Sequence, residues 1–578
     1  MSKTPNFDLK VKTIIDNLRP SEQTCELTGE RWQMDEEEIG WYKKFNVPPS
    51  PFSPKARMWH LSSYMTTYQW WWNKHFDSGA PVLTYLHPKA GIRVLPDKEW
   101  FEKDFSSTNK EFTTQKPFFE IFRELQLGIP VNATRNVKEP ERSIATVSMG
   151  DVDSYFVAGC RSKKSYYGED VLDQEGTIDA NGSLNLTDCY HINHSQRMHG
   201  CKFAYECFDC MGSSFIFDCR NCENCFGAWN KRNAKYLWWN EQLTEEEWEK
   251  RYSEVNLGSW KILSEIKKKF FEVMAQQAIW PADFNQHSEN CSGEYMTKCT
   301  NCKMCVLGVD ATDNWGCIGM YNARGNAFSI VIPGDNNYQS GMVGETSNCK
   351  FSSSLIRSDD LEYSFNCYNC EHCFGCVGLR HKKFHIFNKE YYEDEYWQKV
   401  DELKCSMLDR GEYGRPLPTN FSFGYFPESG IACYLGVELN DEEWTKSGML
   451  KFDPWDDGAY GEMRIDADNL VDRATLPDHV DEMDDEWTKK PIMDEGIKRP
   501  FAYLKPEMEF YRQHKIAPPR DHFTARIRGL MRASNALLPV EMECKKCSKK
   551  MIVNENPTFK NRKIYCHECY LGFLEQYG

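Results

Sequence analysis

The sequence predicts a mixed, β-rich fold, with a central cysteine-rich β-solenoid that carries helical insertions and is flanked by α+β domains of the zinc-ribbon or treble-clef type. Three observations support this prediction. Short aromatic segments alternate with Gly, Asn and Asp turns through the middle of the chain, two long internal repeats organise it, and two CxxC pairs lie near its C-terminus. A chain of 578 residues has room for about three or four domains.

Composition indicates a folded protein in a reducing compartment. Aromatic residues make up 14% of the chain, which provides apolar surface to bury. The first residues lack the basic head and apolar run of a secretory signal, and no run of about eighteen apolar residues follows. We therefore expect a cytoplasmic protein with no membrane association, whose 25 cysteines bind metal or pack as small hydrophobic residues.

The first internal repeat, which we call the end repeat, has an offset of 469 and relates the two ends of the chain. All the matches fall in one register that needs no insertion or deletion. Chance similarity is therefore a poor explanation. The register pairs Glu38 with Glu507, Tyr42 with Tyr511, Pro49 with Pro518, Arg57 with Arg526, and Arg93 with Arg562.

The second internal repeat, which we call the central repeat, has an offset of 148 and relates residues 215–255 to residues 363–403. Each copy contains a run of closely spaced cysteines, then a short aromatic strand, then an acidic segment that begins a helix. In the first copy, Thr244 and Glu247 form a capping-box pattern, so we expect a helical insertion from about Thr244 to Gln277.

Asn-Cys dipeptides recur through the central region, from about residue 151 to residue 425. In a β-solenoid, small side chains stack inward from coil to coil, and Asn occupies corners because it tolerates left-handed backbone angles. The recurrence therefore favours a solenoid. The dipeptides are Asn221-Cys222, Asn224-Cys225, Asn290-Cys291, Asn301-Cys302, Asn348-Cys349, Asn366-Cys367 and Asn369-Cys370.

These features divide the chain into four expected parts. Residues 1–130 form a finger-like N-terminal domain without metal, and residues 131–435 form the cysteine-rich solenoid. Residues 436–500 form an acidic connector, and residues 501–578 form a C-terminal zinc finger.

The C-terminal cysteines have the spacing of a structural zinc site. Cys544 and Cys547 form one CxxC pair, Cys566 and Cys569 form another, and residues 548–565 separate the pairs. Two such turns direct four thiolates to one tetrahedral Zn²⁺, and the strand-like segments between them suit a zinc ribbon or treble clef. His567 lies inside the second pair as an alternative ligand, and four reduced core cysteines are the metal-free alternative.

The N-terminal copy of this segment is expected to have lost its metal. The end repeat places the four cysteines opposite His75, Ser78, Asp97 and Trp100, and neither Ser nor Trp is an ordinary zinc ligand. We expect aromatic packing in place of the ion. The aromatic residues nearest the vacated site are Tyr68, Trp70, Trp71, Trp72, Phe76 and Trp100.

The central cysteines leave three interpretations open: a buried ladder of thiols, one or more zinc ions, or an iron–sulfur cluster. The CxxCxxCxxC run resembles an iron–sulfur motif, but its last interval is two residues and no proline follows. Its sister run has Ala228 in place of the fourth cysteine. The residues concerned are Cys367, Cys370, Cys373, Cys376, Cys219, Cys222 and Cys225.

Charge is distributed unevenly near the C-terminus. Residues 438–499 contain 19 acidic and 8 basic residues, whereas residues 510–563 contain 4 acidic and 13 basic ones. The basic segment is either solvated surface or a phosphate-binding patch. The candidate phosphate contacts are Arg520, Arg526, Arg528, Arg532, Lys545, Lys546, Lys549 and Lys550.

Several segments together resemble a family of uncharacterised cysteine-rich zinc-finger and solenoid proteins from ultrasmall candidate-phyla bacteria and environmental phages. The resemblance rests on residues 25–29, residues 42–49, the Asn-Cys clusters, residues 387–391 and the CxxC pairs. It implies paired finger units at each end and a possible phage-associated or virus-associated location. In that family, cysteines occupy the positions of Ser53, Ala56, His522 and Ala525, so this chain has kept one site of several.

The combined interpretation is a non-enzymatic zinc-binding scaffold or binding protein, with a protein partner or self-assembly as the expected interaction. Nucleic-acid binding through the basic finger is the first alternative. A solenoid carbohydrate hydrolase or lyase is the second, and it would need paired carboxylates, for which Asp151, Asp153, Asp310 and Asp313 are candidates. Common nucleotide, metalloprotease and serine-hydrolase motifs are missing from the sequence.

Overall fold

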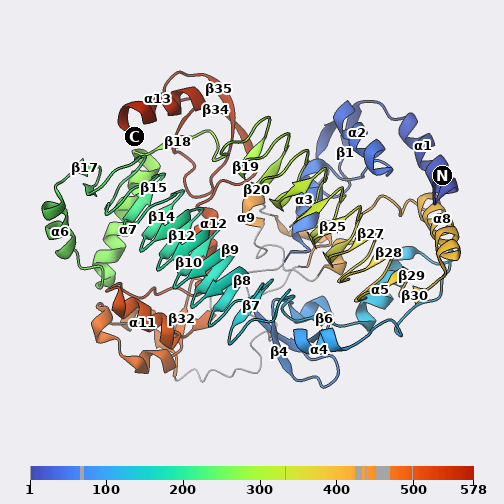
Figure 1. Ribbon diagram of the computed structural model, residues 1–578, viewed down its shortest axis with the longest axis horizontal. Helices are drawn as coiled ribbons and strands as arrows, with labels where there is room; N and C mark the ends of the chain where they lie inside the picture. The colour runs from blue at the N-terminus through green and yellow to red at the C-terminus, as the bar shows by residue number, and fades with distance from the viewer. Residues whose placement is uncertain are drawn as a thin grey trace. The chain divides into compact units, whose positions relative to one another are not determined.

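The computed structural model describes residues 2–65, 70–331, 333–422, 432–436, 439–450, 469–497 and 499–578. The chain divides into two compact units, each made of two segments (Figure 1). The first unit contains residues 1–133 and 284–452, and the second contains residues 134–283 and 453–578. The fold is mixed and β-rich, as predicted. The expected central domain, residues 131–435, is shared between the two units, because each unit combines one end of the chain with one stack of strands.

In the second unit, residues 144–238 form a stack of short parallel strands that we call the first array. Ile178 in β10 pairs with Tyr166 in β9 on one side and with Tyr190 in β12 on the other. Paired residues of successive strands are therefore eleven or twelve positions apart, as at Tyr155 with Tyr166 and at Ile178 with Tyr190. The strands are β7 (Ile144–Thr146), β8 (Tyr155–Lys163), β9 (Tyr166–Glu175), β10 (Ile178–Asn181), β11 (Leu184–Thr187), β12 (Tyr190–Asn193), β13 (Gln196–His199), β14 (Lys202–Tyr205) and β15 (Ser214–Phe217).

In the first unit, residues 293–386 form a similar stack, which we call the second array. Glu371 in β28 pairs in parallel with Asp359 in β27 and with Lys383 in β29, and the step along the chain is the same as in the first array. The strands are β19 (Gly293–Thr297), β20 (Cys305–Val309), β21 (Ile318–Tyr321), β22 (Ala323–Arg324), β23 (Gly334–Asp335), β24 (Gly341–Gly344), β25 (Thr346–Ser347), β26 (Ser353–Ile356), β27 (Asp359–Glu362), β28 (Glu371–Phe374) and β29 (Lys383–Ile386).

The arrays have an unusual backbone, because left-handed residues recur at short, regular intervals. From Phe203 to Trp239, every third residue has a positive φ. Asn accepts this conformation more readily than most residues. The asparagines of all seven Asn-Cys dipeptides have φ between 50° and 56°, which confirms the expected left-handed angle. The cysteine that follows is buried in six cases and partly buried at Cys291.

Helices lie at the ends of the arrays where the central repeat places them. In the second unit, β16 (Leu237–Trp238) pairs with β17 (Glu241–Gln242), and α6 (Glu245–Ser253) then begins at a complete capping box on Thr244, as predicted. Helix α7 (Trp260–Gln276) and strand β18 (Ile279–Pro281) follow. In the first unit, α5 (Phe118–Gly128) and β6 (Val131–Asn132) precede the array segment, and β30 (Lys389–Glu390) and α8 (Glu393–Asp409) follow it.

Each unit also contains an end module, and the end repeat relates the two modules element by element from β1 and β32 onward, whereas α1 and β31 have no counterpart of the same type. The N-terminal module contains α1 (Pro5–Asp16), β1 (Ser21–Thr24), β2 (Arg31–Met34), α2 (Glu36–Phe45), α3 (Pro54–Ser62), β3 (Trp71–Lys74), β4 (Pro81–Thr84), β5 (Val94–Leu95) and α4 (Asp97–Glu102). The C-terminal module contains β31 (Val471–Asp472), β32 (Ile492–Asp494), β33 (Arg499–Phe501), α11 (Lys505–Gln513), α12 (Phe523–Arg532), β34 (Pro539–Glu543), β35 (Lys550–Asn554), β36 (Lys563–Tyr565) and α13 (His567–Tyr577).

The N-terminal module packs on the second array through a buried arginine. Arg57 of α3 has no exposed surface and forms an ion pair with Glu38 of α2. Tyr42 Oη donates a 2.5 Å hydrogen bond to the same carboxylate. The guanidinium lies 4.0 Å from the centre of the Phe328 ring of the array. The buried charge is thus both paired and packed, as burial of an ion requires.

The C-terminal module packs on the first array through the equivalent residues. Arg526 of α12 lies 3.1 Å from Asp179 of the array and 4.0 Å from Glu507 of α11. Tyr511 Oη donates to Glu507 at 3.3 Å, and the Arg526 guanidinium lies 4.7 Å from the centre of the Tyr167 ring. The residues that revealed the repeat in the sequence therefore form the buried contact between module and array.

Only part of the expected acidic connector, residues 436–500, can be described, since residues 451–468 lie outside the described residues. Helix α10 (Asp441–Ser447) begins at a capping box on Asn440. Strands β32 and β33 form an antiparallel hairpin in which Asp494 pairs with Arg499. The described C-terminal part of the segment therefore belongs to a folded module, and most of its acidic residues are exposed, whereas Asp494 is buried. In the described part of the chain, no helix is long and apolar enough to cross a membrane.

Candidate metal centre

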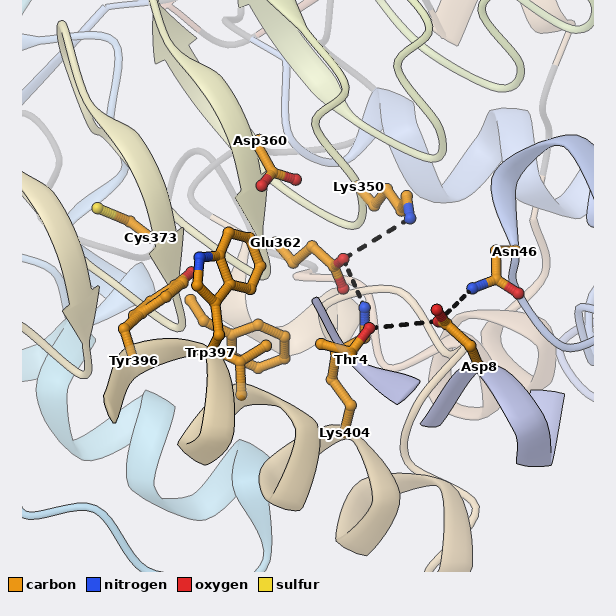
Figure 2. A pocket seen from close by; sticks show the side chains of 12 residues that line it. Thr4, Asp8, Asn46, Lys350, Asp360, Glu362, Cys373, Tyr396, Trp397 and Lys404 are labelled. Carbon is orange, nitrogen blue, oxygen red and sulfur yellow. Dashed lines mark hydrogen bonds and ion pairs between the residues drawn. The ribbon is translucent and has the colours of Figure 1, made fainter. Parts of the chain in front are cut away.

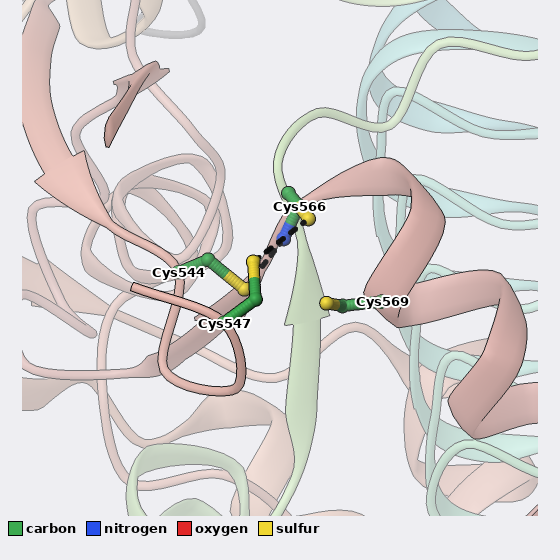
Figure 3. A group of neighbouring side chains, drawn as sticks. All are labelled: Cys544, Cys547, Cys566 and Cys569. Atoms are coloured by element: carbon green, nitrogen blue, oxygen red, sulfur yellow. Dashed lines mark hydrogen bonds between the residues drawn. The ribbon is translucent and has the colours of Figure 1, made fainter. Parts of the chain in front are cut away.

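The four C-terminal cysteines come together from two turns of the C-terminal module (Figure 3). Cys544 and Cys547 lie in the turn between β34 and β35, Cys566 is the N-cap of α13, and Cys569 lies in the first turn of that helix. Their sulfur atoms all lie within 4.8 Å of one another. Cys544 and Cys566 are buried, Cys569 is partly buried, and Cys547 is exposed. The site therefore sits at the edge of the module.

Backbone hydrogen bonds hold the first turn in the shape of a zinc knuckle. Cys544 N donates to Lys549 O at 2.9 Å, and Ser548 N donates to Cys544 O at 2.9 Å. Cys566 N donates to Cys544 Sγ at 3.3 Å. Burial raises the pKa of the Cys544 thiol, but N–H groups of Cys566, Cys547 and Lys546 outweigh it and lower the pKa to about 6. Cys544 is thus prepared to bind metal as a thiolate.

The sulfur geometry fits one tetrahedral ion. Four thiolates bound at about 2.3 Å to a tetrahedral zinc would lie about 3.8 Å apart. The Sγ atoms of Cys547 and Cys566 lie 3.7 Å apart. His567 is exposed and does not belong to the group, so the set of possible ligands consists of four cysteines. A set of four thiolates is typical of closed, structural metal sites.

The metal centre is joined directly to the first array. Strand β36 leads into Cys566 and pairs in parallel with β18, with Ile564 opposite Trp280. Tyr570 of α13 donates a hydrogen bond to Asp218 of the array, and Arg232 lies 3.1 Å from the same carboxylate. The position of α13 therefore depends on the cysteine cluster at one end and on a buried carboxylate along its side.

The N-terminal counterpart uses side-chain packing and hydrogen bonds at the same positions. His75 Nδ1 accepts from the backbone N–H groups of Asp77 and Ser78 at 3.2 and 3.3 Å. Its Nε2 lies 3.0 Å from Glu99 Oε2. Trp100 has no exposed surface and donates from Nε1 to the Pro130 carbonyl at 3.0 Å. The imidazole thus accepts hydrogen bonds from the N–H groups of the turn. In a metal site, a thiolate would accept the corresponding hydrogen bonds.

The aromatic residues expected around this position are only partly described. Trp70 and Trp71 are 6% and 1% exposed, and Trp100 packs against Phe101 with ring centres 5.1 Å apart. Tyr68 lies outside the described residues. The described rings support packing in place of an ion, and the loss of metal from this copy stays a prediction.

Two further turns show the same plan, one in each end module. Cys25 N donates to Glu30 O at 2.8 Å, and the pKa of Cys25 is lowered because hydrogen bonds from Thr28, Ser53 and Leu27 outweigh its burial. Ser53 is the N-cap of α3, just as the candidate ligand Cys566 is the N-cap of α13.

In the C-terminal module, the end repeat places Asp494 opposite Cys25. Asp494 Oδ1 accepts from Gly496 N at 2.9 Å, and Oδ2 accepts from His522 N at 2.9 Å. The four positions at which the resembling family has cysteines therefore lie at the starts of α3 and α12, beside the turns that begin at Cys25 and Asp494: Ser53, Ala56, His522 and Ala525. Sequence reasoning missed Asp494, although extending the repeat from Glu38 back to Cys25 would have found it.

The central cysteines lie inside the two arrays. Cys219 Sγ lies 3.5 Å from Phe217 O and 3.6 Å from Ala228 O. The same two contacts recur at Cys222, Cys225, Cys367, Cys373 and Cys376, whereas Cys370 has only the first. Of the described residues, only the C-terminal quartet forms a group with ligand atoms within 4.8 Å of one another. The interpretation of the array cysteines as a thiol ladder or as metal ligands stays a prediction. The structure shows that they are buried in the cores of the arrays: Cys219, Cys222 and Cys225 in the first array, and Cys367, Cys370, Cys373 and Cys376 in the second.

The candidate phosphate contacts fall into two groups. Arg526 is buried against Asp179, and Arg520 stacks on Trp260 at 4.2 Å while donating to Pro477 O at 2.9 Å. Both guanidinium groups are therefore engaged within the protein. Arg528 is partly buried, and Arg532 is exposed. Lys550 lies 2.9 Å from Glu541. The lysines in and beside the knuckle are all exposed: Lys545, Lys546, Lys549 and Lys550.

The candidate carboxylates have structural partners. Asp151 is fully buried and accepts from Ser162 N at 2.5 Å, while Asp153 forms an ion pair with Arg142 at 2.7 Å. Asp313 accepts from Asn301 Nδ2 at 2.9 Å, a contact between successive strand-connecting segments of the second array. Asp310 and Asp313 both occupy left-handed positions of the backbone, as turn residues do. Asp151, Asp153 and Asp313 therefore have structural partners within their own unit.

Comparison with models of known protein families found no match. A comparison with curated proteins also found none.

Proposed function

We propose that this protein is a zinc-dependent scaffold or binding protein, in which the ion at the C-terminal cysteines is structural. The observation that carries the proposal is the group of four cysteine sulfurs within 4.8 Å, placed by a knuckle and a helix start. Zinc is the ion that such four-thiolate structural sites most often hold. The set contains only protein ligands, which leaves no open position for a substrate.

We further propose that each array is a β-solenoid. Parallel pairing at a step of eleven or twelve residues, together with buried cysteine, alanine and aliphatic residues at the inward positions, supports this architecture. Such a stack is stiff because every repeat is bonded to its neighbours. The exposed side chains form ladders, as at Arg161 with Asp173 and Arg197 with Asp209. A surface of this kind suits a protein partner or self-assembly, and the free thiols suit a reducing compartment such as the cytoplasm.

Metal analysis of the full chain tests the proposal. We expect one zinc per chain after purification without chelator, and release of that zinc by a strong chelator. Loss of zinc should increase hydrogen exchange in residues 539–577, since binding energy at such sites is folding energy. Exchange in the hairpin of β3 and β4 should stay unchanged. Iron in place of zinc, or release of zinc without any change in exchange, would contradict the proposal.

Nucleic-acid binding is the second candidate, and the exposure of four lysines on the knuckle favours it. If they contact phosphates, affinity for a random duplex should fall steeply with salt. Replacing Lys545, Lys546, Lys549 and Lys550 with Gln should then reduce the slope of log K against log salt by about three to four. Lys163→Gln serves as a control, because this lysine is paired with Glu175 at 2.8 Å on the first array. An unchanged slope would remove this candidate.

A further inference from the structure

The first unit contains a cavity of about 180 Å³ between α1, α8 and strands β27 and β28 (Figure 2). By the same kind of measure, one buried water needs about 10–15 Å³. The cavity therefore has room for a small organic molecule. The cysteine quartet belongs to the other unit, so the role of the cavity is independent of the zinc site.

The inner wall of the cavity carries two ammonium groups and one carboxylate. Lys404 Nζ lies 2.9 Å from Glu362 Oε1, and Tyr413 Oη donates to Glu362 Oε2 at 2.6 Å. Burial raises the pKa of Glu362, but Lys404 and Lys350 outweigh it and lower the pKa to about 2. Glu362 is therefore ionised at neutral pH and is already well satisfied by Lys404 and Tyr413.

Lys350 is the incompletely satisfied group of this wall. Its Nζ lies 3.6 Å from Glu362 Oε1, which is longer than a hydrogen bond, and no closer carboxylate lies among the described residues. Its side chain is only 17% exposed. An ammonium group that is largely removed from water needs hydrogen-bond acceptors. An anion in the cavity would supply them.

The remaining acidic residues of the cavity have their own partners. Asp360 lies 2.7 Å from His372 Nδ1, and this contact is the main cause of a raised pKa at His372. Asp8 accepts from Asn46 Nδ2 at 2.7 Å and from Thr4 Oγ1 at 3.2 Å. These carboxylates leave Lys350 available, yet they would repel a ligand with two or more negative charges.

The other side of the cavity is aromatic and aliphatic. Trp397 and Val400 of α8 and Phe374 of β28 line it, and Tyr396 adds a hydroxyl group that has no hydrogen-bond partner among the described residues. A ligand with one anionic end and one apolar end would match both sides. We propose that this cavity binds a small organic carboxylate, with its carboxylate on Lys350 and its apolar part against Trp397 and Val400.

Calorimetric titration of the full, zinc-loaded chain tests this proposal with butyrate and benzoate as probes and with butyramide and benzamide as uncharged matches. We expect saturable binding of at least one carboxylate and at least about tenfold weaker binding of its amide, since hydrogen bonds to a charged group are strong. Equal affinity for acid and amide, or no saturable binding of either acid, would overturn the proposal.

Two variants locate the site. Lys350→Gln should weaken carboxylate binding about tenfold to a hundredfold. Lys163→Gln, the same change at an exposed lysine of the other unit, should leave it unchanged. Tyr396→Phe removes only the hydroxyl and should weaken binding several-fold. If Lys350→Gln does not fold, this variant tests the site, and unchanged carboxylate affinity in it would contradict the assignment. Unchanged affinity in a folded Lys350→Gln variant would contradict the assignment.

Discussion

The last part of the C-terminal module and its counterpart near the N-terminus share one backbone plan and differ in what occupies the centre. Strands β34, β35 and β36 with helix α13 correspond to strands β3, β4 and β5 with helix α4. The former group surrounds four cysteines, and the latter surrounds His75, the buried ring of Trp100 and their hydrogen bonds. The same hairpin and helix are thus compatible with two different central interactions, coordination and packing.

The two centres differ in the side chains that are available to stabilise them. Trp100 has no exposed surface, and its ring packs against Phe101, Phe105 and Tyr368. The C-terminal module has the partly buried Cys569 at the position of Trp100, and Cys547 is exposed. A small segment with no large side chain at its centre has less hydrophobic stabilisation there, which an ion can replace.

Removal of a cysteine ligand should produce the largest effect. Cys566→Ser removes a buried ligand at the start of α13, and structural zinc supplies about 10–16 kcal/mol in finger peptides at neutral pH. We expect loss of zinc and rapid hydrogen exchange across residues 539–577, measured by metal analysis and mass spectrometry. Cys25→Ser is the matched control and should retain the zinc. A Cys566→Ser protein with one full equivalent of tightly held zinc would show that the quartet is not the site.

Truncation of the ring in the N-terminal counterpart should produce the next largest effect. Trp100→Ala removes a fully buried indole and should cost about 3–5 kcal/mol of unfolding free energy, measured by denaturation of the first unit. Zinc content should not change. Trp260→Ala is the control, because that ring is 36% exposed and lies in the second unit, so denaturation of the first unit should not change. A loss of zinc from Trp100→Ala would break the distinction between the two centres.

Acid should destabilise the N-terminal module through protonation of a buried histidine that has no counterpart in the C-terminal module. Burial lowers the pKa of His60 in α3 to about 4, and the end repeat places Gly529 at the equivalent position. The unfolded chain binds a proton near pH 6.5 and the folded chain does not, so stability falls as pH falls from about 6.5 to about 4. The full loss is about 3 kcal/mol.

Hydrogen exchange of α3 at pH 7 and pH 4.5 measures this effect. The variant His60→Gln should show a flatter pH dependence, because Gln does not titrate and can still donate to the Leu417 carbonyl, which lies 2.5 Å from His60 Nε2. Equal pH dependence in the two proteins would assign the acid sensitivity to another group.

The smallest expected effect concerns the turn itself. His75→Ala leaves the N–H groups of Asp77 and Ser78 without their acceptor and should cost about 1–2 kcal/mol, measured by denaturation. His75→Asp should cost less, because Asp494 accepts the corresponding N–H groups in the related turn of the C-terminal module. If both variants cost the same, the acceptor at this position does not stabilise the turn.

Local features were predictable because they depend on neighbouring residues in the chain. The cysteine spacing located the metal centre, Thr244 located the start of α6, and Asn-Cys dipeptides located left-handed backbone positions. The step of eleven or twelve residues between paired strands was missed. The inward positions hold Cys, Ser, Ala, Ile or Leu, so no single residue type repeats at each step and the short period is hard to see in the sequence. The central repeat was visible because it relates two runs that are nearly identical.

The sequence by itself determined which residues could hold a metal, where the repeats lie, and which positions of the two ends correspond. Only the tertiary structure decided that the N-terminal module packs with the second array, that the C-terminal module packs with the first, and that Arg526 is buried against Asp179 instead of being exposed to phosphate. The reason is physical. Thiolate spacing and turn angles are set over a few residues, whereas burial of a charge depends on partners far away along the chain.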